Sequence, residues 1–455
     1  MAVDRVCVIG AGSSGLAALR ELKRRGFRVE CFEKGSAVGG TWRYENDSGT
    51  SAAYASLRTN VSRARMQYPS FPMPAAYGDY VHHRDMAAYL DAYADASGLR
   101  RHIRFSTSVT AVEPSDGGRW RVSLHDGSAG TYDAVVVANG HDWQPTWPAL
   151  PGTTTARVSH ARDYRTADRF AGKHVLVIGA GQSAIEIATE TARVAARTVL
   201  SCRQAHYVVP RYFLGRPSDH LDTELFNRLP WPIVRAMFGI TLRFVHGRMD
   251  ASGLPPPRHR LLERFPPALS DEFLPALRAG RIVARPMLAE LDGDAASFVD
   301  GATEPVDEIV CATGYRISFP FLSEALIVPE GRRLALYRRV LSPAHPSLAF
   351  IGLVDPLGGL LPVVEAQAAW LADVFDETIR LPDRAGMLAA IERRERRTSR
   401  RFDDSPADSI ICDRHAYIRS LRRDRRRARF AWSRLVRARP SCPLRAFPLR
   451  GQLRS

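Results

Sequence analysis

A glycine-rich turn near the start of the chain has the composition of a phosphate-binding site. The segment VCVIGAGSSG, residues 6–15, follows an apolar strand pattern and opens a helical one, with glycines in G-x-G-x-x-G spacing. The first glycine permits a tight turn, the second lets the backbone approach a pyrophosphate, and the third lets helix and strand pack closely. Backbone N–H groups at the start of the helix then face the phosphates. The residues expected to bind a dinucleotide here are Gly10, Gly12, Ser13, Ser14 and Gly15.

A second turn of the same plan occurs in VLVIGAGQSA, residues 175–184, where alanine stands in the third position. It also lies between a buried-strand pattern and a helical pattern. One such motif alone is weak, but a repeat of the plan within one chain strengthens both copies. The residues expected at this second nucleotide are Gly179, Gly181, Gln182, Ser183 and Ala184.

The residue that ends the next strand differs in charge between the two copies. Glu33 stands 23 residues after Gly10. A carboxylate there accepts hydrogen bonds from both ribose hydroxyls and repels a 2′-phosphate. Arg203 stands 24 residues after Gly179, and its guanidinium suits a 2′-phosphate, although an ordinary surface arginine at a strand end is the alternative. The two copies therefore predict two different dinucleotides, FAD held at the first and NADPH exchanging at the second.

The elements around these turns form the same series twice. YDAVVVANG ends at Gly140 and DEIVCATG ends at Gly314, and each has the pattern of a buried parallel strand that closes in a turn. Each copy thus contains a strand, a glycine turn, a helix, a second strand and a closing strand. This series predicts an α/β protein with two doubly wound, Rossmann-like units, whose ligands lie at the carboxyl ends of the strands.

The composition is that of a globular protein, with 45% hydrophobic and 25% charged residues. The six scattered cysteines form no C-x-x-C pair and no metal-binding spacing, so we expect no metal and a reduced, cytoplasmic setting. Strand-like sequence begins by Arg5, so no signal peptide is expected. The longest apolar stretch, residues 348–375, is interrupted by Asp355, Pro356 and Glu365 and is not expected to span a membrane.

The formal net charge of +16 is concentrated at the end of the chain. Residues 419–455 contain thirteen Arg and one Asp, a net of +12, which leaves +4 for the first 418 residues. We expect this tail to be a solvated, disordered extension. An anionic membrane surface or nucleic acid is the alternative partner for it, and no nucleic-acid partner is expected on balance.

Several further segments resemble the flavin-containing monooxygenases, the class B flavoprotein monooxygenases of the dimethylaniline N-oxide-forming type. These segments are GSAVGGTWRY (35–44), YASLRTN (54–60), MQYPSFPMP (66–74), CATGY (311–315) and the stretch 345–367. Residues 150–164 resemble the family fingerprint F-x-G-x-x-x-H-x-x-x-[YF]. His160 and Tyr164 match it, while Thr154 and Ala156 stand where Phe and Gly are expected. The resemblance runs in the family's order from residue 1 to about 415.

The resemblance implies that NADPH reduces FAD and that oxygen adds to carbon 4a of the flavin. The resulting hydroperoxide transfers one oxygen atom to a soft nucleophile of a small molecule, an amine nitrogen or a sulfide sulfur. The departures at Thr154 and Ala156 keep a Baeyer–Villiger or N-hydroxylating relative open as the alternative. A disulfide reductase is set aside because no redox cysteine pair is present. A binding protein that senses nucleotides is the alternative from another class, and a homodimer is one expected assembly.

The resemblance also assigns residues. Asn60 is expected to be catalytic, beside the flavin and NADP⁺, because an amide donates and accepts hydrogen bonds without titrating; a cap or Asx turn is its ordinary role. Trp42 either lies along the flavin or packs in the core, and Arg211 either contacts the NADP phosphate or forms a surface salt bridge. His160 is expected to hold the linker between domains rather than act as a base. The other residues expected at the cofactors are Gly40, Thr41, Thr59, Val61, Val109, Thr313 and Gly314.

The family architecture implies an FAD domain into which an NADPH domain is inserted. A Pro-rich segment, residues 144–152, provides the linker out of the first domain. The expected boundaries are 1–150 for the first part of the FAD domain, 151–318 for the NADPH domain with its insert, 319–418 for the second part of the FAD domain, and 419–455 for the arginine-rich tail.

Overall fold

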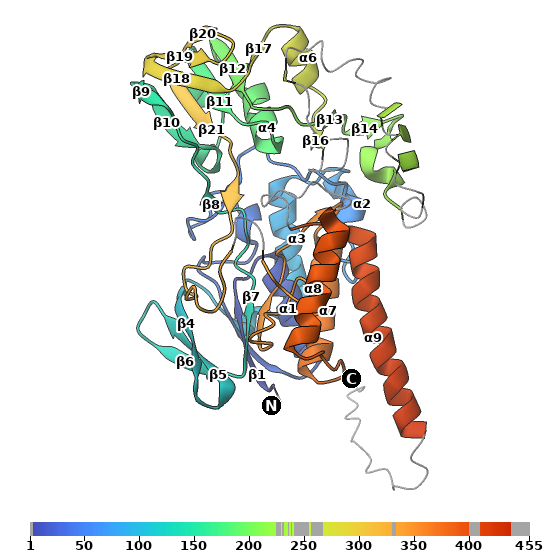
Figure 1. The fold of residues 1–455 in the computed structure, drawn as a ribbon. Coiled ribbons are helices and arrows are strands. Elements are labelled where there is room, and N and C mark those ends of the chain that lie inside the picture. Colours follow the sequence, from blue (N-terminus) through green and yellow to red (C-terminus); the bar gives the residue numbers. More distant parts are fainter. Residues whose placement is uncertain are drawn as a thin grey trace.

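Two parallel sheets, each at the centre of its own lobe, organise the computed structural model of the chain (Figure 1). The structure describes residues 3–223, 267–329, 334–399 and 410–437, together with isolated residues between 229 and 255. In Figure 1 the sheet that contains β1 lies in the lower lobe, and the sheet that contains β11 lies in the upper lobe.

The first sheet has five parallel strands in the order β23-β7-β1-β2-β3. Strand β1 is central and apolar from Val6 to Ile9, with Val6 and Val8 fully buried, because both faces of the sheet are covered. Four of its strands precede residue 140 and β23 follows residue 345, so the sheet is built from two separate stretches of chain. The bounds are β1 Arg5–Ile9, β2 Arg28–Phe32, β3 Ile103–Arg104, β7 Ala134–Val137 and β23 Leu348–Phe350.

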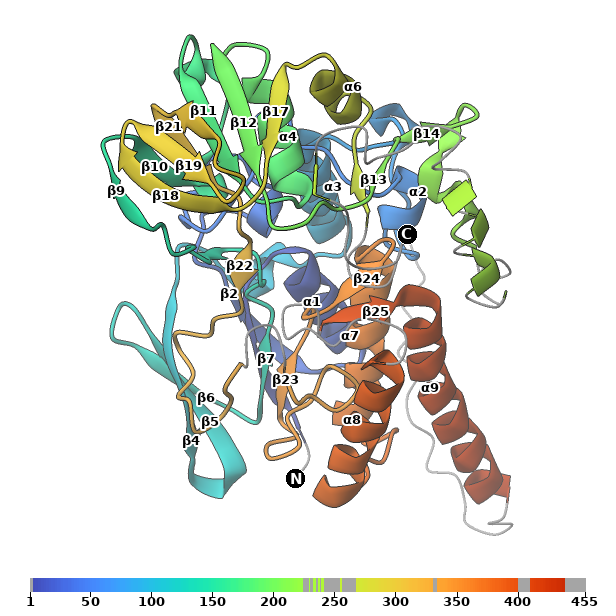
Figure 2. The same cartoon turned by 45° about the horizontal axis from the view of Figure 1, so that its top comes forward.

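Helices cover one face of this sheet and a small antiparallel sheet covers the other (Figures 1 and 2). On α1, Leu16, Leu19 and Leu22 recur at three-residue spacing and are fully buried, which gives the helix one apolar face that packs against α7. Strands β4, β5 and β6 pack against the opposite face, where Trp120 joins a cluster with Ile9. The bounds are α1 Ser13–Arg24, α2 Arg63–Met66, α3 His83–Ala96, α7 Leu361–Phe375, β4 Val109–Ser115, β5 Arg119–Leu124 and β6 Ala129–Tyr132.

The second sheet repeats the arrangement of the first, in the order β10-β21-β11-β12-β17 with all neighbours parallel. Strand β11 lies between β12 and β21, as β1 lies between β2 and β7, so the predicted two copies of one plan are confirmed. A four-stranded sheet, β20-β19-β18-β9, packs beside it. The bounds are β9 Gly152–Thr154, β10 Arg157–His160, β11 His174–Ile178, α4 Gln182–Thr191, β12 Arg197–Ser201, α6 Phe273–Arg278, β17 Ile282–Arg285, β18 Leu288–Gly293, β19 Ala295–Phe298, β20 Thr303–Pro305 and β21 Glu308–Cys311.

The two connections between the lobes pair with each other. Strand β8 (Gln144–Pro145) leads out of the first lobe and runs antiparallel to β22 (Tyr315–Arg316), which leads back. The fully buried ring of His160 lies 5.4 Å from the ring of Trp147 and 5.3 Å from that of Tyr315. Burial lowers the pKa of His160, and its Nδ1 accepts the N–H of Arg162 at 3.1 Å. His160 thus contacts both connections, as the sequence predicts.

The end of the described chain forms a long helix rather than the expected disordered extension. Helix α9 (Arg414–Arg437) packs against α7, and Tyr417, Ile418 and Leu421 on its inner face are buried. These apolar residues recur at helical spacing, which the abundance of arginine obscures in the sequence. The expectation of disorder is therefore wrong for residues 419–437, while residues 438–455 lie outside the described part of the chain.

A buried ion pair also fixes this helix. Asp373 on α7 is fully buried and accepts a hydrogen bond from Arg425 of α9, with 2.5 Å between Nε and Oδ2. Arg25 pairs with the same carboxylate. Helix α8 (Arg384–Ser399) also belongs to this group of helices in Figure 2. Within the described residues no helix is both long and apolar enough to cross a bilayer.

Short strand pairs complete the described elements. Strand β24 runs parallel to β25 and brings the start of α9 beside the segment that follows β23. The bounds are β13 Val208–Val209, β14 Tyr212–Phe213, β15 Arg216–Pro217, β16 Ala268–Leu269, β24 Asp355–Leu357 and β25 Ile411–Asp413.

Candidate active site

The first glycine turn has the geometry that a phosphate-binding turn requires. Gly10 has φ +99°, and a Cβ there would stand 2.7 Å from the carbonyl oxygen of Ala138. A Cβ at Gly15 would stand 1.8 Å from the carbonyl oxygen of Gly10, so only glycine lets α1 approach the turn this closely. Gly12 caps α1 without a side-chain hydrogen bond, and the first turn of α1 carries no acid. The N–H groups at this end of the helix therefore suit a pyrophosphate.

A cavity of about 690 Å³ opens in front of this turn, a volume within the range of ligand pockets. It collects segments that are far apart in the sequence: the turn after β1, the turn after β7, and the stretch that leads into α7. The sequence-predicted residues that line it are Gly10, Gly12, Ser13, Ser14, Glu33, Gly40, Thr41, Trp42, Asn60, Val61 and Val109. Gly15 lies behind the turn and does not line the cavity.

Glu33 lies at the wall of the cavity with its carboxylate held by backbone groups. Its Oε2 accepts the N–H of Ala11 at 2.6 Å, and its Oε1 accepts the N–H of Gly35 at 2.7 Å. Burial raises the pKa of Glu33, while these two N–H groups favour the ionised form. A carboxylate oxygen has two lone pairs, so both oxygens keep capacity to accept hydroxyl hydrogen bonds.

Asn60 and Trp42 lie at the same cavity but differ in burial. Asn60 is exposed, next to Val61, and lines the cavity. Ser62, which follows Val61, donates its N–H to Asp219 Oδ2 at 2.7 Å. This hydrogen bond connects the loop that contains Asn60 to the segment after β15. Trp42, in a short 3₁₀ turn (Gly40–Trp42), both lines the cavity and packs against the core of the first lobe.

The second glycine turn has a more open geometry. Gly179 has φ +142°, and a Cβ there would stand 2.3 Å from the carbonyl oxygen of Ala312, so this glycine is required by the fold. A Cβ at Gly181 would meet nothing within 4 Å. Ala184 is buried on α4. Gly181 caps α4 without a side-chain hydrogen bond, and no acid lies in its first turn, so this helix end also suits a phosphate.

Arg203 follows the carboxyl end of β12 and is exposed. Among the residues that the structure describes, none forms an ion pair or hydrogen bond with its guanidinium. An exposed arginine just after the strand next to β11, without a partner among the described residues, is compatible with a 2′-phosphate site.

Arg211 and Gln182 are engaged by the protein itself. Arg211 donates to Glu186 of α4 at 2.9 Å. Gln182 accepts the N–H of Leu269 at 2.8 Å and donates to Glu186 at 2.8 Å. Tyr54 from the first lobe also hydrogen-bonds to Glu186, and burial raises the pKa of Glu186 to about 7. The salt-bridge alternative for Arg211 is therefore the one observed, and the Gln182 side chain holds the neighbouring loop.

Three other predicted residues have structural partners and do not line the cavity. Thr59 is buried, and its Oγ1 accepts the N–H of Val81 at 2.9 Å. Thr313 donates its hydroxyl to the carbonyl oxygen of Thr146 at 2.6 Å, and Gly314 accepts the N–H of Thr146 at 2.9 Å. Thr313 and Gly314 thus belong to the connection between the lobes. Ser183, on the first turn of α4, also lies away from the cavity.

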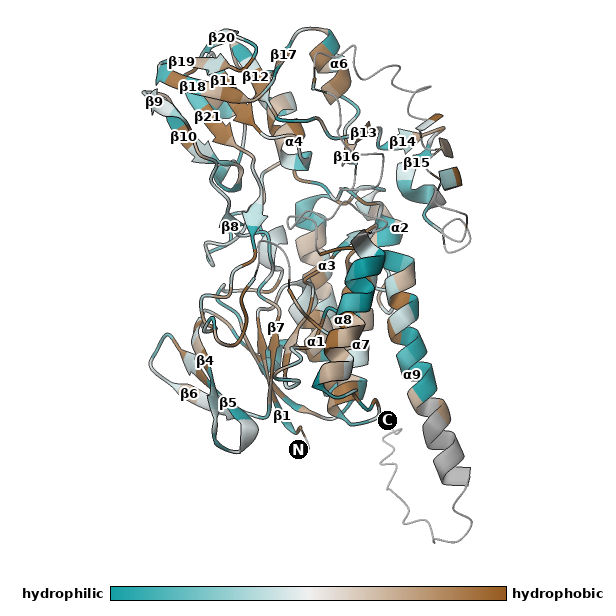
Figure 3. Cartoon of the chain, in the orientation of Figure 1, coloured by the Kyte–Doolittle hydropathy of each residue, from teal (hydrophilic) through white to brown (hydrophobic). Residues whose placement is uncertain are grey.

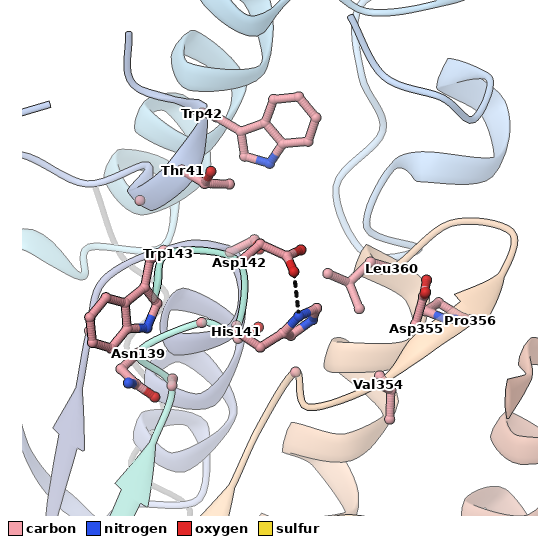
Figure 4. A pocket seen from close by; sticks show the side chains of 18 of the residues that line it. Thr41, Trp42, Asn139, His141, Asp142, Trp143, Val354, Asp355, Pro356 and Leu360 are labelled. Carbon is pink, nitrogen blue, oxygen red and sulfur yellow. Dashed lines mark hydrogen bonds and ion pairs between the residues drawn. The ribbon is translucent and has the colours of Figure 1, made fainter. Parts of the chain in front are cut away.

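Sequence reasoning missed a group of cavity residues (Figure 4). Side chains from the turn after β7 line the cavity opposite side chains from the loop before α7, and a hydrogen bond of 3.0 Å joins His141 Nδ1 to Asp142 Oδ1. The sequence could have indicated the residues after β7, because ligands of parallel sheets bind beyond the carboxyl ends of the strands. The missed residues that Figure 4 labels are Asn139, His141, Asp142, Trp143, Val354, Asp355, Pro356 and Leu360.

Each of the two parallel sheets carries a glycine turn followed by a helix whose N-terminus has no side-chain cap, and a large cavity lies at the first turn. These features define a protein that binds two dinucleotides, the class that includes flavin-dependent oxidoreductases. The chain belongs to the flavin-binding monooxygenase-like family, whose model matches residues 3–424. It is thus a flavoprotein monooxygenase, and the glycine turn, the cavity and Glu33 fit FAD as its flavin.

Curated relatives cover most of this chain. It is 33% identical over 443 residues to flavin-containing monooxygenase 1 of Oryctolagus cuniculus, covering 92% of this chain and 82% of that protein. It is 34% identical over 420 residues to dimethylaniline monooxygenase [N-oxide-forming] 2 of Rattus norvegicus, covering 87% and 78%.

Solved structures share the fold at lower identity. S-allyl-L-cysteine S-oxygenase from Allium sativum superposes with a TM-score of 0.70 at 24% identity, covering 96% of this chain and 93% of that one. The open structure of cyclohexanone monooxygenase gives a TM-score of 0.69 at 18% identity, covering 96% and 98%. Steroid monooxygenase bound to NADP gives 0.68 at 21% identity, covering 92% and 96%.

Proposed function

We propose that this protein is an NADPH-dependent FAD monooxygenase that transfers one atom of O₂ to a soft nucleophile of a small molecule, an amine nitrogen or a sulfide sulfur. The observation that carries the proposal is the cavity that joins the first glycine turn to Asn60, in a chain that has a second, separate dinucleotide turn. When bound, FAD reduced by NADPH supplies the activated oxygen.

The residues of this chain bind the two dinucleotides and orient them. The free N–H groups of α1 hold the pyrophosphate and Glu33 holds the ribose of the first nucleotide. Thr41 and Trp42 line the flavin cavity, and the amide of Asn60 donates and accepts hydrogen bonds there. The start of α4 holds the second pyrophosphate, and Arg203 binds the 2′-phosphate that distinguishes NADPH from NADH.

The choice of nucleophile rests on the relatives and on the cavity wall. The relatives that are more than 30% identical are named flavin-containing and dimethylaniline monooxygenases, and the solved garlic neighbour is an S-oxygenase. Much of the wall beyond the glycine turn is apolar, with Val209, Leu269 and Leu360, which suits a weakly polar amine or sulfide. A Baeyer–Villiger reaction is the second candidate, because cyclohexanone monooxygenase shares the fold.

Rapid-mixing spectroscopy tests the proposal. The FAD-loaded protein is reduced with NADPH and mixed with oxygen, first alone and then with a thioether, a tertiary amine or a cyclic ketone. We expect a transient flavin spectrum, distinct from the oxidised and reduced forms, whose decay an amine or thioether accelerates with formation of the oxygenated product. Direct reoxidation with hydrogen peroxide as the sole product under all conditions would contradict a monooxygenase, and turnover of the ketone alone would favour the second candidate.

Asn60 variants test the assigned catalytic residue. Asn60→Ala and Asn60→Leu leave the glycine turn and Glu33 intact, so FAD content should be unchanged. Removing a polar group at a reacting centre costs on the order of a hundredfold in rate, and we expect NADPH consumption to become uncoupled from product formation. Ser323→Ala, at an exposed polar residue that does not line the cavity, is the control. Unchanged coupling in both Asn60 variants would remove Asn60 from the mechanism.

A further inference from the structure

Four arginines form an exposed row on helix α9. Arg422, Arg423, Arg426 and Arg427 are exposed, and no described residue forms an ion pair with any of them. At 3.6 residues per turn, they occupy the arc opposite the buried side chain of Leu421. The helix therefore faces α7 with its apolar side and solvent with a continuous strip of positive charge.

The acids close to this helix do not neutralise the row. Asp424, the only acid between residues 414 and 437, pairs with Arg338 at 2.8 Å. Asp373 of α7 pairs with Arg425 on the inner side at 2.5 Å. Glu21 and Glu365 line a hollow together with Arg422 and Arg425, but they form their ion pairs with Arg20 and Arg24. None of these four acids forms a described ion pair with the exposed row.

An exposed aromatic ring lies on the same arc as the arginines. Phe430 is 60% exposed, and its helical position is one turn beyond Arg426 and Arg427, on the outward side of α9. Figures 1 and 2 both show α9 at the outer edge of the molecule, and Figure 3 shows hydrophilic colouring along its middle.

We propose that this outer face of α9 docks the protein onto an anionic phospholipid surface. The four guanidinium groups match headgroup phosphates, and Phe430 reaches the apolar boundary below them, a combination typical of interfacial helices. A row of arginines alone would suit nucleic acid equally well. The aromatic ring on the same arc favours a lipid surface, because a lipid headgroup layer offers an apolar region beneath its phosphates.

Vesicle flotation with the full-length FAD-loaded protein tests this proposal. We expect the protein to float with vesicles that contain phosphatidylglycerol and not with pure phosphatidylcholine vesicles, and to be released by high salt, which screens charge. Each basic residue near an anionic surface contributes about 1 kcal/mol, or roughly fivefold in partition. The variant R422Q/R423Q/R426Q/R427Q should therefore lose at least tenfold of its vesicle binding.

A matched control distinguishes the effect of the arginines on α9 from the effect of the protein's net charge. The variant R101Q/R119Q/R121Q/R281Q removes the same charge at exposed sites away from α9 and should bind vesicles like the wild type. Both variants should keep FAD content, thermal stability and turnover, because neither set lines the cavity. Equal loss in both variants, no vesicle binding by the wild type, or tighter binding to duplex DNA than to anionic vesicles would overturn the proposal.

Discussion

Glu33 directly follows β2, whereas Arg203 stands one residue beyond the corresponding position of the second copy, which Cys202 occupies. The surroundings of the two charged residues also differ. The carboxylate of Glu33 is held in one orientation by two backbone N–H groups, whereas Arg203 is exposed at the end of its strand. A fixed carboxylate suits two ribose hydroxyls that always arrive in the same place. An exposed guanidinium suits a phosphate on a nucleotide that binds and leaves.

Replacing Arg203 tests which nucleotide the second site prefers. A charge-assisted hydrogen bond contributes about 1.5–3 kcal/mol, so Arg203→Ala should raise the KM for NADPH about tenfold to a hundredfold with little change for NADH. Steady-state kinetics with both nucleotides measures the effect. Arg193→Ala, at an exposed arginine that pairs with Glu272 in the same lobe, is the control. Equal changes for the two nucleotides would exclude a contact with the 2′-phosphate.

Single residues also mark the limit of what the sequence reveals. The types and spacing of Glu33 and the glycines predict their positions, because these residues act through the local turn. Gln182 and Arg211 are different, since their partners Leu269 and Glu186 come from other parts of the chain. Side chains whose roles depend on such distant partners cannot be assigned from spacing alone.

At the scale of elements, the residue at the third glycine position of each motif, Gly15 or Ala184, depends on how closely the helix approaches the turn. In the first copy a Cβ at Gly15 would collide with the backbone of Gly10 at 1.8 Å. In the second copy the Cβ of Ala184 would lie 3.4 Å from a Cβ placed on Gly179, an ordinary contact. Helix α4 therefore accommodates an alanine that α1 cannot.

The open space at Gly181 leads to a prediction about the second turn. Because a Cβ at Gly181 meets no protein atom within 4 Å, Gly181→Ala should fold with an unchanged melting temperature. A bound pyrophosphate would meet the added methyl group, so the affinity for NADPH should fall at least about tenfold, or 1.4 kcal/mol. Calorimetric titration measures this affinity. Gly15→Ala is the contrasting variant and should lower both stability and FAD content; unchanged NADPH affinity in Gly181→Ala would place the nucleotide elsewhere.

An ion-pair cluster links three strands of the second lobe and should respond to pH. Glu304 on β20 is buried and accepts hydrogen bonds from Arg197 of β12 at 2.6 Å and from Arg285 of β17 at 2.5 Å. The hydrogen bond from Arg197, more than that from Arg285, lowers the pKa of Glu304. A lowered folded-state pKa stabilises the fold above the unfolded value of about 4.3, and this stability is lost as the pH falls through the folded-state pKa.

Glu304→Gln tests this cluster. At neutral pH the variant should lose about 1.5–3 kcal/mol, the range for charged hydrogen bonds, with the lower end expected because both arginines are partly exposed. Thermal unfolding across the acidic range should show a smaller acid-induced loss than in the wild type. Glu290→Gln, at an exposed position on β18 of the same sheet, should behave like the wild type. Parallel pH profiles for Glu304→Gln and the wild type would show that Glu304 does not stabilise the fold.

The elements that the sequence predicts well are those with local signals. The strands around both glycine turns are apolar runs, and their order follows from the repeated plan. Helix α9 was missed because its buried residues Tyr417 and Leu421 are few among many arginines, and because the partner of Arg425 lies on α7. In a helix with so many charged residues, the apolar face can be identified only when the surface against which the helix packs is known.

At the scale of the whole molecule, the last helix is part of the first lobe. Ending the chain at Asp413 would remove Ile418, Leu421 and Arg425, and each buried aliphatic side chain contributes about 1.5–3 kcal/mol. We expect this truncated protein to have a strongly lowered melting temperature or to lose FAD. A chain that ends at Arg437 keeps every described contact of α9 and should match the full-length protein. Differential scanning fluorimetry of both forms decides, and an unaffected shorter form would contradict an integral role for α9.

The paired connections β8 and β22 have a consequence for the history and handling of this protein. Both ends of the second lobe leave the first at adjacent strands, and neighbouring strands stand only about 4.8 Å apart. A gene segment for a nucleotide-binding unit with adjacent ends can enter a host gene at a single position without separating the strands on either side. The same adjacency would let a short peptide rejoin the flanking strands if the unit were excised.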